Sequence, residues 1–562
     1  MKLNKEQYRA AHHKDGPMLV LAGPGSGKTH LLVERIRIMI EEYNIPPDNI
    51  LVITFSRKAA RQMQARFEKR VEDRSYPVTF GTFHAVFYHI LQDHDPTTNR
   101  LISEEERQKL IANAAAFCGI SLPCSEKDDI EALSGHISAY KNFGEEEYFS
   151  DGPGSELDID EKDDIRRLIC EYDRLCRKEG FIDFDDMIIN CRQLFARHEM
   201  ILRRWQKKFR YFLVDEFQDI NQAQYDVLRL LAGDAMNVFA VGDDDQAIYR
   251  FRGACPGLMK KFTQQYRGCR RVDLTMNYRC SENIIGAADT LVRNNKDRFE
   301  RQIQRHLPSA RGGIVEIVHS ENTVVQAAFV CDRIEELIDA GCDPWDIAVL
   351  YRSSHCVKMF EKTAGERGLA VKDTDGISGV YKRRLKIHEA YSKAHNGNIS
   401  RRDFFLIMNN PDRGLSREAL CNSNGDYIGD LKRYYADSPQ MLDKVFDLER
   451  TIMSYDVNEF PNDTTDKKDM VNIMTAHASK GLEFRCVFVI GLQEGLFPHH
   501  KNMTGSSVEE ERRLMYVAMT RAKQQLYLCT LGTMYGKRES RFAAEAAKNR
   551  KYISDIIHLT RL

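Results

Sequence analysis

The chain has 562 residues and a formal net charge of −1, and its composition, 42% hydrophobic and 29% charged, is ordinary for a globular protein. No apolar run approaches the roughly 18 residues of a membrane span, and the N-terminus MKLNKEQYRA lacks the apolar core of a signal peptide. We therefore expect a cytoplasmic protein with no membrane partner. The chain is too long for one hydrophobic core, and its 14 cysteines show no zinc-type spacing. The near-zero charge neither supports nor excludes a nucleic-acid partner.

The first predicted strand, Met18 to Leu21, leads through a glycine-rich turn into a helix with apolar residues at helical spacing. This order is typical of a phosphate-binding loop, in which backbone N–H groups and the helix N-terminus hold phosphates. Lys28 would contact the outer phosphates, and the hydroxyl of Thr29 would ligate Mg²⁺. Alanine replaces the first glycine of the usual pattern. The residues expected around the phosphates are Ala22, Gly23, Pro24, Gly25, Ser26, Gly27, Lys28 and Thr29.

A second apolar strand ends in the acidic sequence FLVDEFQD, residues 212–219. Asp215 would bind Mg²⁺ directly or through water, and Glu216 would orient or deprotonate the attacking water. The same acids would suit the start of a helix, because INQAQYDVLRLLAG follows with an amphipathic pattern. The two roles are compatible.

A third strand, NVFAVGD from Asn237, delivers the sequence DDDQAIYRFRGA at its C-terminal end, where open parallel sheets bind their ligands. We expect this loop to lie beside the γ-phosphate. The three acids at 243–245 indicate either a second metal site or an acidic turn that caps a helix, and we favour the turn. Alternating aromatic and arginine residues are typical of contact with a nucleic-acid strand.

These motifs belong to an ordered series that runs from Leu3 to Lys523: LNKEQYRA, AGPGSGKT, VITFSRKAARQM, GTFHAVFYHIL, DEFQD, VGDDDQAIYRFRGA, LTMNYRC, IAVLYRSS, VNIMTAHASKGLEFRCVFVIGLQEGLFP and EEERRLMYVAMTRAK. The series resembles that of the UvrD/Rep-type superfamily 1 DNA helicases. The resemblance implies an α/β fold with two RecA-like P-loop NTPase motor domains, each with a mainly helical insertion. It also implies a motor that uses ATP and Mg²⁺, moves 3′ to 5′ on single-stranded DNA and unwinds duplex at single-strand/double-strand junctions, in DNA repair or replication restart.

The resemblance assigns further residues to the nucleotide. Gln246 would sense the γ-phosphate, Gln7 would read the adenine edge, and Tyr278 would stack on the base. Glu483 would contact the ribose. His30 stands where the family commonly has an arginine near the base, which predicts looser selectivity for adenine.

Two arginines, Arg279 and Arg521, match the pair that reaches the γ-phosphate from the second motor domain in this family. Arginine fingers accelerate phosphoryl transfer by about 10³ to 10⁵-fold, so hydrolysis would require the two domains to close. Without its motif, Arg521 would be interpreted as a surface ion pair of the charged helix EEERRLMYVAMTRAK.

On the DNA side the resemblance implies a set of aromatic, imidazole, hydroxyl and cationic side chains. Phe251 replaces the tryptophan that is usual in the family, which predicts somewhat weaker base stacking. Phe83 has core packing as its alternative, because Phe80 and Phe87 are close in sequence. The expected DNA contacts are Phe83, His84, Tyr249, Phe251, Arg252, Thr475, His477 and Lys480.

The motif spacing places the first motor domain at 1–85 and 211–277 and the second at 278–375 and 468–540. The first insertion, 86–210, is helix-rich and carries an acidic run that would repel DNA. The second insertion, 376–467, is shorter than in the family. It begins with a basic run that either contacts duplex phosphates or forms a solvated helical face. Residues 541–562 form a C-terminal tail.

Two other functions fit part of the sequence. A translocase would walk on single strands and strip proteins without efficient unwinding, and a regulatory clamp would bind ATP and DNA with little turnover. The presence of both catalytic acids and both arginines argues against the clamp. Protein partners in repair or replication would suit the resemblance, although no residue identifies one.

Overall fold

The computed structural model describes residues 2–72, 74–94, 100–120, 126–150, 154, 157–250, 253–266, 268–301, 304–305, 312–373, 376–377, 379–411, 413–420, 423, 425–454, 469–500, 502–503, 505–532 and 538–559. The chain divides into two compact units. The first consists of Met1–Gly312 and Thr504–Thr520, and the second of Gly313–Met503 and Arg521–Leu562.

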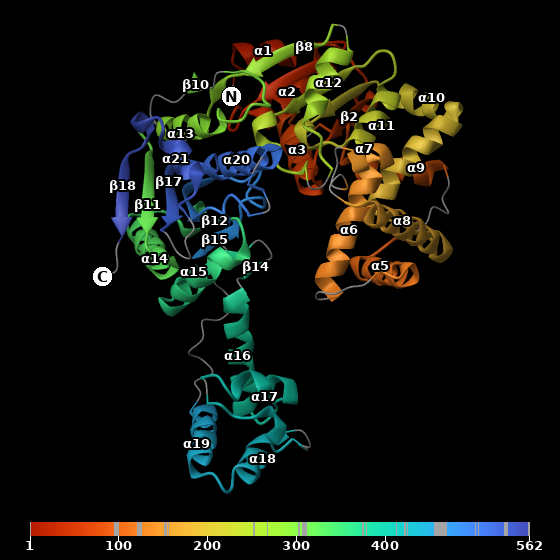
Figure 1. Cartoon of the computed structure of the whole chain (residues 1–562). Helices are drawn as coiled ribbons and strands as arrows, with labels where there is room; N and C mark the ends of the chain where they lie inside the picture. The colour runs from red at the N-terminus through yellow and green to blue at the C-terminus, as the bar shows by residue number, and fades with distance from the viewer. Residues whose placement is uncertain are drawn as a thin grey trace. The chain divides into compact units, whose positions relative to one another are not determined.

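The first unit is built on a six-stranded parallel sheet with the strand order β3-β2-β6-β7-β1-β8 (Figure 1). The four central strands β1, β2, β6 and β7 are continuous buried apolar runs because helices cover both faces of the sheet, whereas the edge strands β3 and β8 are partly exposed. The strands are β1 (Met18–Ala22), β2 (Ile50–Ile53), β3 (Thr79–Gly81), β6 (Tyr211–Val214), β7 (Val238–Gly242) and β8 (Arg270–Leu274).

Alternate residues of the four central strands enter separate cores on the two faces of this sheet. In β1, Leu19 and Leu21 join one core, while Val20 and Ala22 join the other. The second of these cores also receives α1 (Lys5–Ala11), α2 (Lys28–Glu41) and α3 (Arg57–Arg70). The first receives α4 (Phe83–His94), α9 (Phe184–Arg197), α10 (Glu199–Lys208), α11 (Gln222–Ala232) and α12 (Gly257–Gln265).

A separate helical core lies between α4 and α9 in the sequence. It contains Ile111, Leu168 and Tyr172 among its buried residues. In the predicted insertion at 86–210, helices α4, α9 and α10 thus pack on the six-stranded sheet of the first unit. Only the middle part of the insertion forms a core of its own. The helices of that part are α5 (Glu104–Cys118), α6 (Glu126–Phe143), α7 (Glu145–Ser150) and α8 (Ile159–Glu179).

Two further helices complete the first unit, and they come from distant parts of the sequence. Helix α13 (Glu282–Val292) packs against α20 (Gly505–Met519). Both helices belong to the first unit, although the sequence places them in the predicted second motor domain, at 278–375 and 468–540. They join the first unit because they pack against each other there.

The second unit contains an eight-stranded sheet with the order β14-β13-β15-β12-β16-β17-β11-β18, in which only the β13–β14 pair is antiparallel. Helices α14 (Thr323–Asp339) and α15 (Ser354–Glu366) contribute to its core. The strands are β11 (Ile314–Ser320), β12 (Ile347–Tyr351), β13 (Val371–Asp373), β14 (Gly376–Ile377), β15 (Val471–Thr475), β16 (Phe484–Leu492), β17 (Ala522–Leu531) and β18 (Asp555–Leu559).

The second insertion and the C-terminal segment also have defined structure. Residues 379–453 form α16 (Gly379–His395), α17 (Arg401–Ile407), α18 (Tyr427–Tyr434) and α19 (Pro439–Met453), with their own core around Phe404 and Leu448. The segment predicted as a tail contains α21 (Arg541–Ala547) and β18, which pairs with β11 at the edge of the second sheet. The two parallel sheets confirm the predicted α/β class, and no helix within the described ranges is long and apolar enough to cross a membrane.

Candidate active site

The turn between β1 and α2 has the geometry of a phosphate cradle. Gly27 precedes α2 with a φ of +83° and offers no side-chain cap to the first N–H groups of that helix. The Nζ atom of Lys28 is buried and makes no hydrogen bond to any described residue, and the Oε1 atom of Glu216 lies 3.7 Å away. Uncapped helix N–H groups beside a buried ammonium fit the outer phosphates of a nucleotide.

Gly25 is required by a close approach as well as by its φ of +64°. A Cβ atom at this position would lie 2.5 Å from Cβ of Arg279 and 3.0 Å from its backbone nitrogen. The backbone N–H of Tyr278 donates to the carbonyl of Gly25 at 2.9 Å, and Asn277 Nδ2 donates to the carbonyl of Pro24 at 2.6 Å. The loop is therefore held against residues 277–279, which include Tyr278 and Arg279, two residues predicted to contact the nucleotide.

The N-terminal helix closes another side of the loop. Gln7 is buried, and its Nε2 donates to the carbonyl of Ser26 at 2.9 Å. Asn4 caps α1 in a reciprocal capping box with Gln7, and its Nδ2 donates to the hydroxyl of Tyr278 at 2.8 Å. The sequence indicated Gln7 and Tyr278 separately, whereas Asn4 and Asn277, which connect them to the loop, were missed.

Asp215 and Glu216, the two acids predicted to be catalytic, follow β6, whose neighbours in the sheet are β2 and β7. Glu216 has a φ of +52°, a left-handed conformation that costs a non-glycine residue about 1–3 kcal/mol. It does not begin a long helix: α11 is capped by Asn221, which forms a capping box with Gln224. The helix-start interpretation of Asp215 and Glu216 is thus wrong, because a short 3₁₀ turn, Phe217–Asp219, separates them from α11.

Gln218 connects Glu216, the predicted water-activating acid, to the next strand, a role that the sequence did not indicate. Its Nε2 donates to Oε2 of Glu216, and its Oε1 accepts from the backbone N–H of Asp243 at 2.9 Å. Gly242 permits this contact, since a Cβ atom there would lie 2.7 Å from Oε1 of Gln218.

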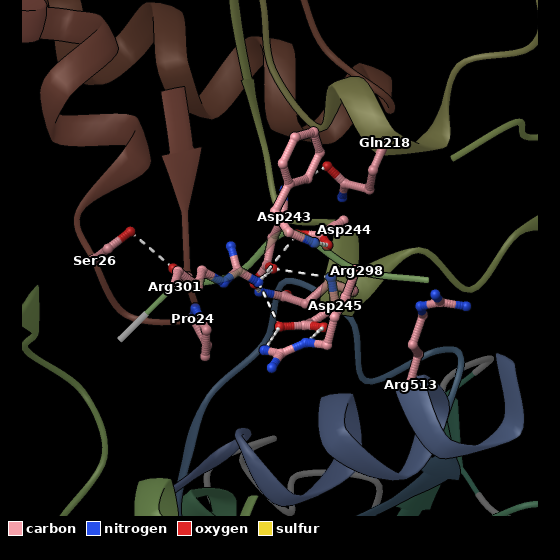
Figure 2. A network of polar contacts seen from close by, with 12 residues as sticks. Pro24, Ser26, Gln218, Asp243, Asp244, Asp245, Arg298, Arg301 and Arg513 are labelled. Carbon is pink, nitrogen blue, oxygen red and sulfur yellow. Dashed lines mark hydrogen bonds and ion pairs between the residues drawn. The ribbon is translucent and has the colours of Figure 1, made fainter. Parts of the chain in front are cut away.

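The acidic turn at 243–245 caps the 3₁₀ helix Asp244–Gln246, with Asp243 accepting from the backbone N–H of Asp245. The Nε2 of the buried Gln246 donates to Oδ2 of Asp243. Although the three carboxylates lie close enough together to hold a cation, two arginines, Arg298 and Arg301, form ion pairs with them (Figure 2). The sequence did not indicate these arginines.

Two comparisons with known proteins agree on the family. The model of the UvrD/REP helicase N-terminal domain matches residues 3–267, and that of the UvrD-like helicase C-terminal domain matches residues 272–389 and 431–532. The chain belongs to the UvrD/REP helicase family. It is 31% identical to the ATP-dependent DNA helicase PcrA of Bacillus subtilis, over 97% of this chain and 85% of that protein. It is also 29% identical to the putative ATP-dependent DNA helicase YjcD of Bacillus subtilis, over 96% of this chain and 80% of that protein, and 27% identical to DNA helicase II of Escherichia coli, over 97% and 87%.

In this UvrD/REP helicase, the second unit carries Arg521 and Glu483, the remaining residues predicted to contact the nucleotide. Arg521 follows α20 at the start of β17 and is 2% exposed, and its Nη1 donates to the carbonyl of Leu482 at 3.1 Å. Its burial rules out the surface ion pair on the helix. Glu483 is half-exposed and lies 3.4 Å from Lys523. The phosphate loop with Gln7, Tyr278 and Arg279 lies in the first unit.

The residues expected to face DNA are distributed over both units. Tyr249 stacks on Phe55, with ring centroids 4.9 Å apart, and Phe55 is 43% exposed. Phe83 is buried in the motor core beside Phe87, so the core-packing alternative describes it here. Burial lowers the pKa of His84, whose ring meets Phe184 edge-on.

The other DNA-facing candidates are described only in part. Phe251 and Arg252 lie outside the described residues. In the second unit Thr475 ends β15, and its Oγ1 accepts from the backbone N–H of Ala478 at 3.2 Å. His477 and Lys480 lie in the turn that follows, where the N–H of Lys480 donates to the carbonyl of His477.

Proposed function

We propose that this chain is an ATP-dependent DNA helicase that moves 3′ to 5′ along single-stranded DNA and opens duplex at single-strand/double-strand junctions. The observation that carries the proposal is a chain of contacts from Lys28 through Glu216 and Gln218 to the turn that bears Gln246 and Tyr249. These few side chains join a phosphate-binding group to an aromatic surface. A motor needs such a link to convert hydrolysis into movement.

The first unit offers a candidate residue for each catalytic task. Lys28 would neutralise the outer phosphates, Glu216 would orient the attacking water, and Arg279, packed against Gly25, would stabilise charge that develops in the transition state. Mg²⁺, which neutralises phosphate charge when bound, would be held by Thr29 and Asp215. The residues proposed to complete the nucleotide site are Gln7, His30, Tyr278, Gln246, Glu483 and Arg521.

The DNA path would begin at the aromatic pair of Phe55 and Tyr249. Bases stack on any aromatic face, with about 1–3 kcal/mol per base, and Phe55 exposes part of its ring. His84, Thr475, His477 and Lys480 would contact the strand, with Phe251 and Arg252 beside Tyr249. Phe55 was missed because a phenylalanine after an apolar strand is usually a core residue.

Two assays on the purified chain test the proposal: ATP turnover with and without single-stranded DNA, and single-turnover strand displacement on 3′-tailed and 5′-tailed duplexes. We expect DNA to stimulate turnover and only the 3′-tailed duplex to be opened, while Lys28→Ala abolishes both activities. Stimulated turnover without displacement would identify a translocase, and nucleotide binding without turnover would identify a clamp.

The cellular role that we propose is DNA repair or replication restart, with protein partners from those processes. Sensitivity of a deletion strain to DNA damage, corrected by the wild-type gene but not by Lys28→Ala, would test it.

A further inference from the structure

Two guanidinium groups from one short segment meet the three carboxylates of the acidic turn. Arg298 binds both oxygens of Asp245, at 3.0 Å from Nε and 2.6 Å from Nη2. Nη2 of Arg301 contacts Asp243, Asp244 at 3.3 Å and Asp245 at 2.7 Å. The side chain of Arg301 is 3% exposed, and those of Asp243 and Asp245 are fully buried. Figure 2 shows both arginines directed at the turn.

This arrangement makes the turn depend on the two arginines. Three adjacent carboxylates repel one another in a low-dielectric interior unless cations balance them. Burial raises the pKa of Asp244 to about 6, whereas for Asp245 the charges of Arg301 and Arg298 outweigh burial and hold the pKa below its usual value. Loss of one guanidinium would leave a carboxylate that must take up a proton or move toward water.

The segment that carries the arginines is itself fixed to α20. Asn295 Nδ2 donates to the carbonyl of Glu509 at 3.0 Å, and the backbone N–H of Lys296 donates to Oε1 of Glu509 at 2.9 Å. Arg513 Nη2 donates to the carbonyl of Asp297 at 2.6 Å. The arginines therefore connect α20, which precedes Arg521 in the chain, to the acidic turn.

On its other side the turn holds two groups that the proposed function places in hydrolysis. Asp243 accepts from the side chain of Gln246, and its backbone N–H donates to Gln218, which in turn donates to Glu216. A displacement of Asp243 would thus move both the γ-phosphate sensor and the water-activating acid.

We propose that Arg301 and Arg298 are positioning residues for ATP hydrolysis: they hold the acidic turn so that Gln246 and Glu216 keep their catalytic places, and they join that turn to α20. The inference rests on the proposed function, because it assigns to these arginines a part in the same reaction. Both arginines act through the carboxylates of Asp243 and Asp245, with which they form ion pairs.

The test compares substitutions of Arg301 in the full chain. We expect Arg301→Gln to lower kcat for DNA-stimulated ATP turnover by about 10- to 100-fold, the effect of a small misplacement of catalytic groups, and to leave the Kd for a fluorescent ATP analogue unchanged. Arg301→Lys should recover part of kcat, because a lysine keeps the charge but cannot bind several carboxylates with a planar fork. Arg298→Gln removes one guanidinium only, so it decides the question if Arg301→Gln does not fold.

Arg413→Gln is the matched control, because Arg413 is also buried and binds a carboxylate, Asp447 at 2.8 Å, in the helical core of the second insertion. It should lower Tm without lowering kcat. The inference is overturned if the wild type shows DNA-stimulated turnover and the Arg298 and Arg301 variants that fold keep the kcat of the control. A wild type without DNA-stimulated turnover would instead refute the proposed function.

Discussion

Replacing Gly25 with alanine should separate nucleotide binding from hydrolysis. The new methyl group would lie 2.5 Å from Cβ of Arg279 and 3.0 Å from its backbone nitrogen, so Arg279 must move outward. Carbon atoms pack at about 3.5–4.0 Å, which implies a displacement of about 1 Å. A misplacement of this size costs about 100-fold in rate. This loss is smaller than the roughly 10³ to 10⁵-fold acceleration that an arginine finger contributes, as expected if Arg279 is displaced but still present.

The left-handed φ of Gly25 adds a backbone cost of about 1–2 kcal/mol for alanine, and this cost must be separated from the effect on Arg279. Gly16 provides the control, because its φ is +87° and a Cβ atom there would meet nothing within 4 Å. Gly16→Ala should lose similar stability and keep its turnover.

The assay measures kcat for DNA-stimulated ATP turnover, the Kd of a fluorescent ATP analogue and the Tm of each variant. Gly25→Ala should lower kcat by about 100-fold. The double variant Gly25→Ala/Arg279→Ala should have a kcat only slightly lower than that of Arg279→Ala alone, because both changes disrupt the same contact. If Gly25→Ala matched Gly16→Ala in kcat, or if its loss added fully to that of Arg279→Ala, the close packing of Arg279 on the loop would not be what hydrolysis requires.

Four further outcomes are expected. Glu216→Gln should bind nucleotide and lose DNA-stimulated turnover, and near-normal turnover would remove Glu216 from water activation. Phe55→Ala should keep turnover without DNA but weaken single-strand binding by about 1–3 kcal/mol, and unchanged affinity in a salt series would show that its stacking on Tyr249 is only structural. Burial lowers the pKa of His84, so the unfolded state binds a proton at this residue more readily than the folded state does. The free energy of unfolding should therefore fall as pH drops below about 6.5. Denaturant titrations of His84→Asn should show a smaller fall over this pH range, and a pH profile identical to that of the wild type would contradict the prediction. We expect the second insertion, which the sequence predicts to be shorter than in the family, to make few contacts with duplex phosphates. Unwinding should therefore decline with duplex length and show a shallow salt dependence, whereas processive opening of long 3′-tailed duplexes would contradict this.

The sequence by itself determined the helicase family and predicted most of the proposed nucleotide site. Local patterns sufficed, because the phosphate loop from Ala22 to Thr29 is defined by the order of strand, glycine turn and helix within one short segment. The acids after β6 and the turn after β7 could likewise be placed together, since parallel strands bring their carboxyl ends to one edge of a sheet.

Tertiary structure alone decided which distant residues support that site. Asn277 reaches the loop, and Arg298 and Arg301 reach the acidic turn, across long separations in sequence that no periodicity records. The same holds for β18, which has no strong strand signal and exists because β11 offers it an open edge. Burial decided between a core role and a surface role for residues whose type allowed both. Phe83 lies in the core, whereas Phe55 exposes part of its ring. Arg521 is buried and does not lie on the surface of a helix. Exposure depends on what packs over a side chain, and that is fixed only when the whole chain has folded.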